Sequence, residues 1–354
     1  MDSPRLSYLK GGIGVKNRTK LRWGILGCAN IAESSIMPAI RDSSSGMIEA
    51  VASRELGKSQ RLAKKFRVGK AYSSYEELLS DPAVDAVYVP LPNHLHKEWV
   101  ILAAKAGKHI LCEKPMALHA SEAAEMVEAA SKAGVVLAEA FMYRHHPLMW
   151  EIKERIMSGD LGSLRVIRGV FTCNSAEDVS NIRFRREYGG GVLYDLGGYP
   201  LSAARFFTGA EPQAVTVHAQ YSHEHDGVEM TAAGLLEFPG GVSCCFDVSL
   251  WAEERRCLEI VGSKGRIEIP FAFSGKAQSG YRWIRNGVEL VFEEEHHNSY
   301  LLQIEDFGAS VLQGRSPKFS ALDAVNNAML LEACHTAAEQ QQRVVMPVQG
   351  KGLG

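Results

Sequence analysis

The sequence lacks the features that would mark a membrane, secreted or nucleic-acid-binding protein. No apolar run approaches the ~18 residues that a membrane span requires. The opening segment, MDSPRLSYLKGGIGVKNRTK, contains no apolar core of the kind that a secretory signal carries. The 39 Lys and Arg residues are balanced by 41 Asp and Glu residues, whereas binding a phosphate backbone needs an excess of positive charge. We therefore expect neither a membrane nor a nucleic acid as partner.

Cysteine is present without any pattern of pairing. The seven cysteines are an odd number, they are scattered along the chain, and none forms a CxxC pair. Such usage is typical of reduced thiols in a cytoplasmic protein and not of a disulfide framework. The length of 354 residues, at ~150 residues per domain, favours two domains.

The first part of the chain alternates short apolar runs with helical patterns. The runs are continuously apolar, which is typical of strands covered on both faces; they span residues 21–26, 47–53, 85–91, 108–113 and 134–139. Helical spacing is seen over residues 59–66, 96–107 and 121–134. This alternation predicts an α/β unit, a Rossmann domain with a doubly wound parallel sheet, over residues 21–146. A flexible lead over residues 1–20 precedes it.

The second part of the chain predicts an α+β domain over residues 147–354. Strand patterns follow one another over 163–173, 214–222, 231–238, 242–251, 257–263 and 265–271, with turn signals at 239–241, 263–265 and 285–287. Helical patterns span 147–160, 299–314 and 321–340. We expect a large, mostly antiparallel open sheet. Both alternating sets of residues in 231–238 and 242–251 are apolar, so the face without helices needs a partner, which predicts a homodimer or homotetramer.

A turn directly after the first predicted strand has the position and spacing of a dinucleotide-binding site. It reads G-x-A-x-x-A, a variant of G-x-G-x-x-G, and comprises Gly27, Cys28, Ala29, Asn30 and Ile31 before Ala32. Such a turn brings backbone N–H groups close to a pyrophosphate, and the helix that follows adds partial positive charge. The strand, turn and helix together favour a nucleotide site over a plain connection.

The end of the second predicted strand indicates which nicotinamide dinucleotide is bound. An NAD site usually carries an acid here that accepts hydrogen bonds from the ribose 2′-hydroxyl. This chain instead offers the hydroxyl of Ser53 and the guanidinium of Arg54, with Lys58 nearby, which suit a 2′-phosphate. The sequence therefore predicts NADP, with NAD still possible because Glu55 follows Arg54.

Two further motifs supply candidate catalytic groups. Glu113 and Lys114 leave the carboxyl end of a predicted parallel strand, the edge at which ligands bind in open α/β sheets. Asp195 and Tyr199 follow three consecutive glycines and stand four residues apart, on one helical face. A phenol beside a lysine is a workable acid/base pair, because the cation lowers the pKa of the tyrosine from its ordinary value of about 10.

Together these motifs resemble the Gfo/Idh/MocA oxidoreductases, the family of glucose–fructose oxidoreductase, inositol dehydrogenase and their relatives. The matching segments, in the family's order, are GILGCANIA, AVASR, VDAVYVPLPNHLH, AGKHILCEKP, EAFMYRHHP and GGGVLYDLGGY. The resemblance implies a Rossmann domain followed by an α+β domain, with Lys114, Asp195 and Tyr199 in the catalytic site. Tyrosine in place of histidine resembles the branch of glucose–fructose oxidoreductase, dihydrodiol and xylose dehydrogenases and keto-sugar reductases.

The resemblance also implies a reaction and a set of cofactor contacts. A hydride would pass between the nicotinamide and a carbinol or ketone carbon of a cyclic sugar, with Tyr199 exchanging the hydroxyl proton and Lys114 lowering its pKa. Asp195 would orient the substrate or the lysine. Further cofactor contacts are implied for Leu91, Asn93, His96, Glu113, Lys114 and Arg183. A dihydrodiol or inositol-type dehydrogenase, a glycosidase with a transient redox cycle and a non-catalytic NADP sensor stay open as alternatives.

Pairs of histidines suggest an alternative function with different chemistry, that of a metal hydrolase. Zinc would take three or four ligands from such pairs, which stand at 94 and 96, 145 and 146, 223 and 225, and 296 and 297. His94 and His96 fall where the nicotinamide ribose is expected, and no carboxylate stands at ligand spacing from them. We therefore predict a site without metal.

Overall fold

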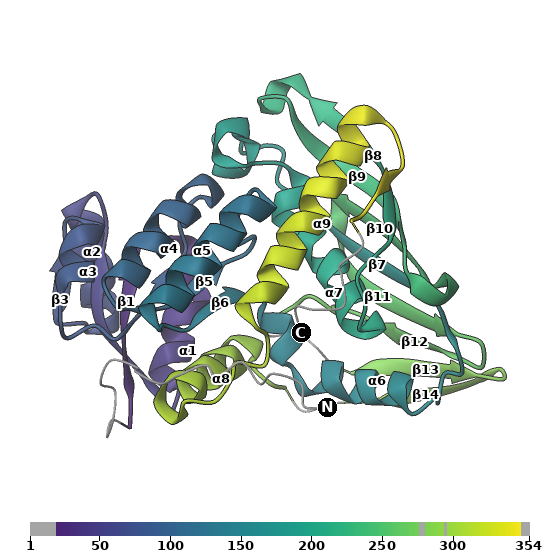
Figure 1. The fold of residues 1–354 in the computed structure, drawn as a ribbon, viewed down its shortest axis with the longest axis horizontal. Helices are drawn as coiled ribbons and strands as arrows, with labels where there is room; N and C mark the ends of the chain where they lie inside the picture. The colour runs from purple at the N-terminus through teal and green to yellow at the C-terminus, as the bar shows by residue number, and fades with distance from the viewer. Residues whose placement is uncertain (1–18, 276–279, 294–295, 348–354) are drawn as a thin grey trace.

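The fold is seen in a computed structural model that describes residues 19–275, 280–293 and 296–347 (Figure 1). The predicted flexible lead lies outside the described residues, apart from positions 19 and 20. Two sheets organise the described chain, one of six strands and one of nine. They lie on opposite sides of the molecule, with the longest helix between them (Figure 1).

The first sheet is parallel throughout and has the strand order β3-β2-β1-β4-β5-β6. Its strands are β1 (Leu21–Leu26), β2 (Gly46–Ala52), β3 (Lys70–Tyr72), β4 (Ala86–Val89), β5 (His109–Glu113) and β6 (Leu137–Ala140). This is the Rossmann order, and it confirms the predicted doubly wound fold. The order reverses between β1 and β4, which is where ligands bind in such sheets.

Helices cover both faces of this sheet because its strands are apolar on both sides. They are α1 (Met37–Asp42), α2 (Leu56–Phe66), α3 (Tyr75–Ser80), α4 (His96–Lys105) and α5 (Ala120–Ala133), and a π-helical turn, Ala32–Ile36, precedes α1. One apolar cluster joins the sheet to α3, α4 and α5, and a second joins it to α1 and α2. Gly134, with φ 68° in the left-handed region, ends α5.

The second sheet has the order β14-β13-β12-β11-β7-β10-β9-β8-β15. Its strands are β7 (Leu164–Asn174), β8 (Ala214–Ser222), β9 (Val228–Glu237), β10 (Ser243–Ser249), β11 (Trp251–Gly262), β12 (Arg266–Ile269), β13 (Tyr281–Arg285), β14 (Val288–Phe292) and β15 (Val344–Val345). Among the described strands of this second sheet, only β7 and β10 pair in parallel. The predicted mostly antiparallel sheet is therefore confirmed. The turn signal at 285–287 makes the hairpin between β13 and β14, with Asn286 and Gly287 at positive φ.

The last helices tie the two sheets together. Helix α6 (Pro147–Met157) follows the first domain, α7 (Gly198–Thr208) packs on β7, and α9 (Ala321–Gln340) packs against α5, α7 and β8. Helix α8 (Ser299–Gln313) returns to the first domain, where Ile304 and Phe307 join the apolar cluster of α1. The chain after residue 147 thus contributes directly to the packing of the parallel sheet.

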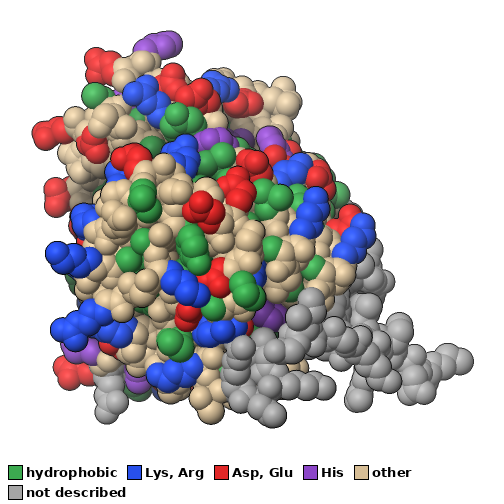
Figure 2. Space-filling view, turned by 90° about the vertical axis from the view of Figure 1, so that its left-hand side faces the viewer, with side chains coloured by type: hydrophobic (Ala, Val, Ile, Leu, Met, Phe, Trp, Pro, Cys, Tyr) green, Lys and Arg blue, Asp and Glu red, His purple; other side chains and the backbone are tan. Residues whose placement is uncertain are grey.

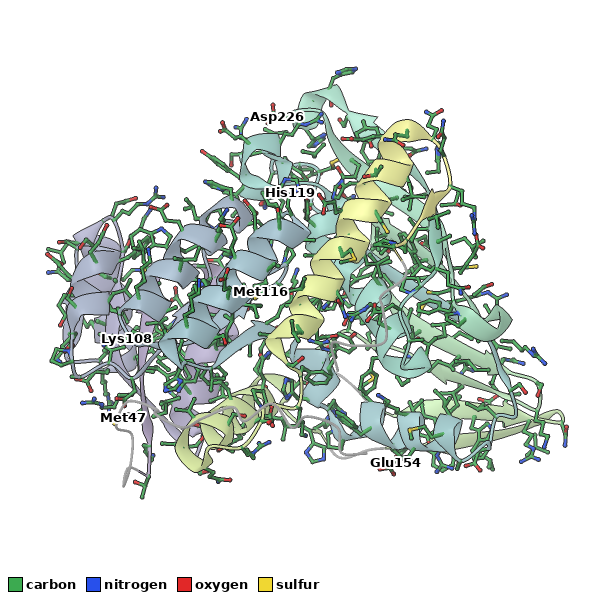
Figure 3. All side chains as sticks on the ribbon, in the orientation of Figure 1. Met47, Lys108, Met116, His119, Glu154 and Asp226 are labelled. Atoms are coloured by element: carbon green, nitrogen blue, oxygen red, sulfur yellow. The ribbon has the colours of Figure 1, made fainter. Side chains whose placement is uncertain are left out.

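A buried carboxylate fixes the segment after β5 against α9. Glu139 accepts hydrogen bonds from the backbone N–H of Met116, at 2.8 Å, and from Nδ2 of Asn327, at 2.9 Å. Lys108 and Met116 flank β5 at its two ends (Figure 3). Because Glu139 is buried, losing either partner would leave an unsatisfied polar group, so this junction is a rigid support for the residues at the end of β5.

The charged side chains of the surface carry no dominant sign. The end of the molecule formed by α2, α3 and β3 bears both basic and acidic side chains (Figure 2). All seven cysteines are free thiols. A bilayer-spanning helix would need a length and apolar character that none of the described helices has.

Candidate active site

A cavity of about 830 Å³ opens at the carboxyl ends of the parallel strands and extends to the second sheet. The dinucleotide turn and the ends of β4 and β5 form one part of its wall. The segment from β7 to α7, with β11 and α8, forms the rest. Among the predicted site residues, the wall includes Cys28, Ala29, Asn30, Ile31, Leu91, Asn93, Glu113, Lys114, Arg183, Asp195 and Tyr199.

The dinucleotide turn has the geometry that a close-approaching ligand requires. Gly27 has φ 114°, which side chains rarely allow, and its N–H donates to the carbonyl of Ala52 at 2.9 Å. A Cβ on Gly27 would lie 3.1 Å from Cδ2 of Leu91. The next four residues line the cavity just where the helix begins, which is the position that a pyrophosphate site takes in such folds. These residues fit a nicotinamide dinucleotide.

The three residues predicted to select NADP have different surroundings. Arg54 lines a second, smaller cavity of about 330 Å³, together with Tyr75 and other residues after β3 and in α4. The Nζ of Lys58 instead lies 2.6 Å from the carboxylate of Glu55 on the exposed surface. Ser53 is buried at the end of β2, where its side chain forms a hydrogen bond with the Cys28 thiol. Burial raises the pKa of that thiol. Arg54 is therefore the predicted cation that faces a cavity.

A charged cluster forms where β5 meets the start of α7. The Nζ of Lys114 donates to the backbone carbonyl of Asp195 at 2.5 Å and lies 3.4 Å from its Oδ1. The Nε of Arg183 donates to the other carboxylate oxygen at 2.8 Å. Burial alone would raise the pKa of Asp195, but the charges of Lys114 and Arg183 outweigh burial and hold that pKa below its ordinary value. Asp195 is thus an anion that orients two cations.

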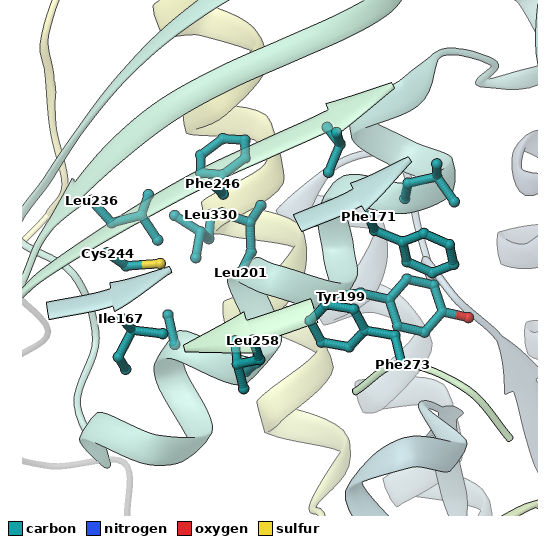
Figure 4. Packing of buried hydrophobic residues seen from close by; sticks show 14 of the residues in the cluster. Ile167, Phe171, Tyr199, Leu201, Leu236, Cys244, Phe246, Leu258, Phe273 and Leu330 are labelled. Atoms are coloured by element: carbon teal, nitrogen blue, oxygen red, sulfur yellow. The ribbon is translucent and has the colours of Figure 1, made fainter. Parts of the chain in front are cut away.

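Tyr199 stands at the edge of an aromatic cluster with its hydroxyl directed away from it (Figure 4). Its ring centroid lies 5.0 Å from that of Phe171 and 5.6 Å from that of Phe273. The Nζ of Lys114 lies 4.9 Å from the ring centroid, over its face. Burial raises the pKa of Tyr199 above its ordinary range, and the nearby carboxylates of Glu113 and Asp195 raise it further.

The expectation of a lowered pKa for Tyr199 is therefore wrong for this arrangement, because burial raises that pKa. The ammonium contacts the ring and Asp195, while desolvation dominates at the hydroxyl. The phenol accordingly keeps its proton at neutral pH. A protonated phenol beside a cation is suited to donate a hydrogen bond, or a proton, to an oxygen that gains negative charge.

Glu113 is a second carboxyl group of the wall. It accepts a short hydrogen bond from the hydroxyl of Tyr88 on the neighbouring strand, β4. Burial raises the pKa of Glu113, and the hydrogen bond and the charge of Lys114 only partly oppose that effect. This carboxyl group therefore contributes less negative charge to the cavity than its formal charge suggests.

His96 lies behind the cavity and not on its wall, in contrast to the predicted cofactor contact. The residue has no exposed surface, and its ring nitrogens lie 2.8 Å from the carbonyl oxygen of Leu91 and 2.9 Å from that of Pro115. Burial lowers the pKa of His96, and the two carbonyl acceptors only partly oppose that effect. His96 joins the chain after β4 to the chain after β5, and its structural role is to position Leu91 and Lys114.

Glu229 is a support for the site that the sequence analysis missed. Its carboxylate accepts a hydrogen bond from the N–H of Leu193 at 3.0 Å, at the start of the helical segment that carries Asp195. Gly191 packs so closely that a Cβ there would lie 2.3 Å from Oε1 of Glu229. Burial raises the pKa of Glu229 to about 7. The only signal in the sequence is an acid within an apolar strand.

The histidine pairs do not gather into a ligand set in the described part of the chain. No group of three or more His, Cys, Asp or Glu side chains there is arranged to hold a metal. His94 stacks on Tyr188, with ring centroids 4.7 Å apart. His225 contacts the hydroxyl of Ser222 at 2.8 Å, and the rings of His146 and His297 lie 5.6 Å apart.

A Rossmann sheet, a glycine turn at its first strand and a lysine at the end of β5 define a dinucleotide-binding oxidoreductase. Comparison with known proteins gives the same class. Residues 21–141 match the model of the oxidoreductase family with an NAD-binding Rossmann fold, and residues 149–268 match the Gfo/Idh/MocA C-terminal domain. The chain belongs to the Gfo/Idh/MocA oxidoreductase family.

Its relatives include enzymes of sugar metabolism. A D-xylose 1-dehydrogenase (NADP(+)) from Haloferax volcanii is 33% identical over 90% of this chain and 98% of its own length. The structure of a 3-ketoreductase from Actinomadura kijaniata with NADP and TDP-benzene superposes with a TM-score of 0.86, at 30% identity, and covers 90% of this chain and 98% of that one. The structure of an aldose-aldose oxidoreductase from Caulobacter crescentus also superposes with a TM-score of 0.86, at 29% identity, and covers 92% of this chain and 99% of that one.

Proposed function

We propose that the protein is an NADP-dependent dehydrogenase or reductase that acts on a CH–OH or keto group of a cyclic sugar or sugar derivative. The observation that carries this proposal is the convergence of Lys114, Asp195 and Tyr199 on a cavity whose other end is the Gly27 turn. The named activities of the relatives support the same reaction class. Glu113 and Arg183 complete the polar wall around the reacting position.

In the proposed reaction the chain's own residues exchange a proton with the substrate oxygen and stabilise the negative charge on it. Bound NADP would supply or accept the hydride. The phenol of Tyr199, which burial keeps protonated, would donate a proton to the oxygen of a carbonyl that is being reduced, and would take it back in the reverse direction. The ammonium of Lys114, held by Asp195, would stabilise negative charge on that oxygen.

A substrate panel tests this function. Pyranoses, keto-sugars, a trans-dihydrodiol and inositol are each incubated with NADP(H) or NAD(H), and the absorbance of the reduced nicotinamide is followed. We expect net turnover with a sugar and NADP(H). Cleavage of a glycoside without net change in the cofactor would instead indicate a glycosidase with a transient redox cycle. Turnover of the dihydrodiol or inositol alone would indicate a dihydrodiol or inositol-type dehydrogenase.

We infer NADP preference from Arg54, and a variant tests it. A charge-assisted contact with the 2′-phosphate contributes about 1.5–3 kcal/mol, so Arg54→Ala should weaken NADPH binding ~10-fold or more and leave NADH binding unchanged. Lys58→Ala should have a smaller effect, because Glu55 already pairs with that ammonium. Dissociation constants of both cofactors are measured for each variant. An equal loss for NADPH and NADH in Arg54→Ala would remove this residue from the 2′-phosphate site.

We also propose a cytoplasmic homo-oligomer, a dimer or tetramer, in which residues 147–354 bind substrate and form the interface, while residues 21–146 bind the cofactor. The free thiols support the location. The exposed side chains of Leu235 and Cys245, which are partners across β9 and β10, support an interface on the face of the second sheet opposite α9. Sedimentation at micromolar protein concentration tests it, and a monomer there contradicts it.

A further inference from the structure

The part of the cavity wall that belongs to the second sheet carries an arginine that the proposed reaction does not use. Arg256 lies on β11 and is in register with Phe171 of β7. Its guanidinium carbon lies 5.2 Å from the centroid of the Phe171 ring, which in turn lies 5.0 Å from the centroid of the Tyr199 ring. The guanidinium therefore faces the cavity with one aromatic ring between it and Tyr199.

The hydrogen bonding of this guanidinium is incomplete. The Nε of Arg256 is buried and has no acceptor among the described residues. Its Nη2 lies 3.1 Å from the carboxylate of Glu254, whose side chain is 55% exposed and which is not part of the cavity wall. A buried N–H without an acceptor costs free energy, and an exposed ion pair offsets little of that cost. The enclosed Nε is out of reach of a ligand, but the Arg256 side chain is 31% exposed and lines the cavity, so a bound ligand can supply an acceptor to its accessible part.

The charges of the cavity also favour an anion. Lys114 and Arg183 share one carboxylate, that of Asp195. Burial favours the neutral form of Glu113, and Asp178 is a second carboxylate of the wall, which accepts hydrogen bonds from neutral groups of its own loop. With Arg256 the wall carries three cations against the carboxylates of Asp178 and Asp195, so an anionic substrate would be attracted there.

We propose that Arg256 binds an anionic group, a carboxylate or a phosphate, that the sugar carries away from its reacting carbon. This inference rests on the proposed function, and it narrows the substrate to an acidic or phosphorylated sugar derivative. A guanidinium offers two parallel N–H donors that match either group, and stacking on Phe171 fixes the plane in which those donors lie.

The test compares sugars that differ only in charge. Glucose is paired with glucuronate and with glucose 6-phosphate, and kcat/KM is measured for wild type, Arg256→Met and Arg256→Lys. Wild type should prefer an anionic member ~10-fold or more, with the difference mainly in KM, and Arg256→Met should lose that preference while retaining its activity on glucose. Arg256→Lys should retain part of it. The two anionic sugars distinguish a carboxylate site from a phosphate site.

A neighbouring residue gives a matched control. Arg255 precedes Arg256 on the same strand, is more than half exposed and pairs with Asp247 outside the cavity wall. Arg255→Met should therefore give the same kcat/KM values as wild type for every sugar. Added salt should weaken the binding of the anionic sugars and leave that of glucose unchanged. A preference of wild type for glucose, or an equal loss for charged and neutral sugars in Arg256→Met, overturns the proposal.

A binding measurement separates this proposal from the proposed function. If no sugar is turned over, the redox assignment fails, and calorimetry of glucuronate and glucose 6-phosphate against the NADP-saturated protein decides the anion site by itself. Binding in wild type that is lost in Arg256→Met supports the site. No binding to wild type, or equal binding to both proteins, overturns it.

Discussion

Lys114→Met should lower kcat by at least the 10²–10⁴-fold that is typical of removing a general acid–base group, and it should leave cofactor binding nearly unchanged. The Nζ of Lys114 holds the backbone and the carboxylate of Asp195 and lies over the ring of Tyr199. Without this ammonium, Asp195 retains Arg183 as its cationic partner among the residues that the structure describes, and the substrate oxygen loses the charge that would stabilise it. Single-turnover rates and NADPH dissociation constants measure the two effects separately.

The control for this variant is a lysine of the same domain far from the cavity wall. Lys132→Met removes an exposed ammonium that pairs with Glu128 at 2.5 Å along α5, and kcat should stay at the wild-type value. A kcat of Lys114→Met close to that of Lys132→Met would show that Lys114 does not take part in the chemical step.

Tyr199→Phe should lower kcat by about 10²–10⁴-fold while the protein stays folded. The ring keeps its packing against Phe171 and Phe273, so the change removes a hydroxyl that points out of the aromatic cluster. Burial raises the pKa of this hydroxyl, so the rate of sugar oxidation in wild type should increase with pH across the neutral range, since oxidation needs the deprotonated group. Tyr199→Phe should lose that dependence. A pH–rate profile unchanged by the substitution would assign the proton to another group.

Tyr143→Phe is the matched control for Tyr199→Phe. Tyr143 is fully buried, its ring lies 5.9 Å from that of Tyr199, and its hydroxyl donates to Oγ of Ser202 at 3.0 Å. Removing the Tyr143 hydroxyl should lower the free energy of unfolding by about 1 kcal/mol and change kcat little.

The double variant of Lys114 and Tyr199 should have a kcat hardly lower than that of the slower single variant, because the losses in kcat are not additive when two groups act as a unit. Additive losses would mean that the two residues act independently.

Local patterns in the sequence carried most of the architecture and the chemistry of the candidate site. Continuous apolar runs predicted a parallel sheet because strands covered on both faces are mostly apolar, and the turn at Gly27 is a short-range signal that requires positive φ. The segments AGKHILCEKP and GGGVLYDLGGY, through their family resemblance, led to Lys114, Asp195 and Tyr199, which the fold brings to one wall. Residues four apart on one helix must share a face whatever surrounds them.

Only the tertiary structure decided what surrounds each of these groups. The pKa of Tyr199 rises because the fold buries its ring among Phe171 and Phe273, a desolvation that no local pattern records. His96 lies behind the wall because two strand ends close around it, and Arg256 reaches the cavity because β11 happens to lie beside β7. Spacing along a chain fixes neighbours within one helix or strand, whereas burial and charge depend on segments that meet only when the chain folds.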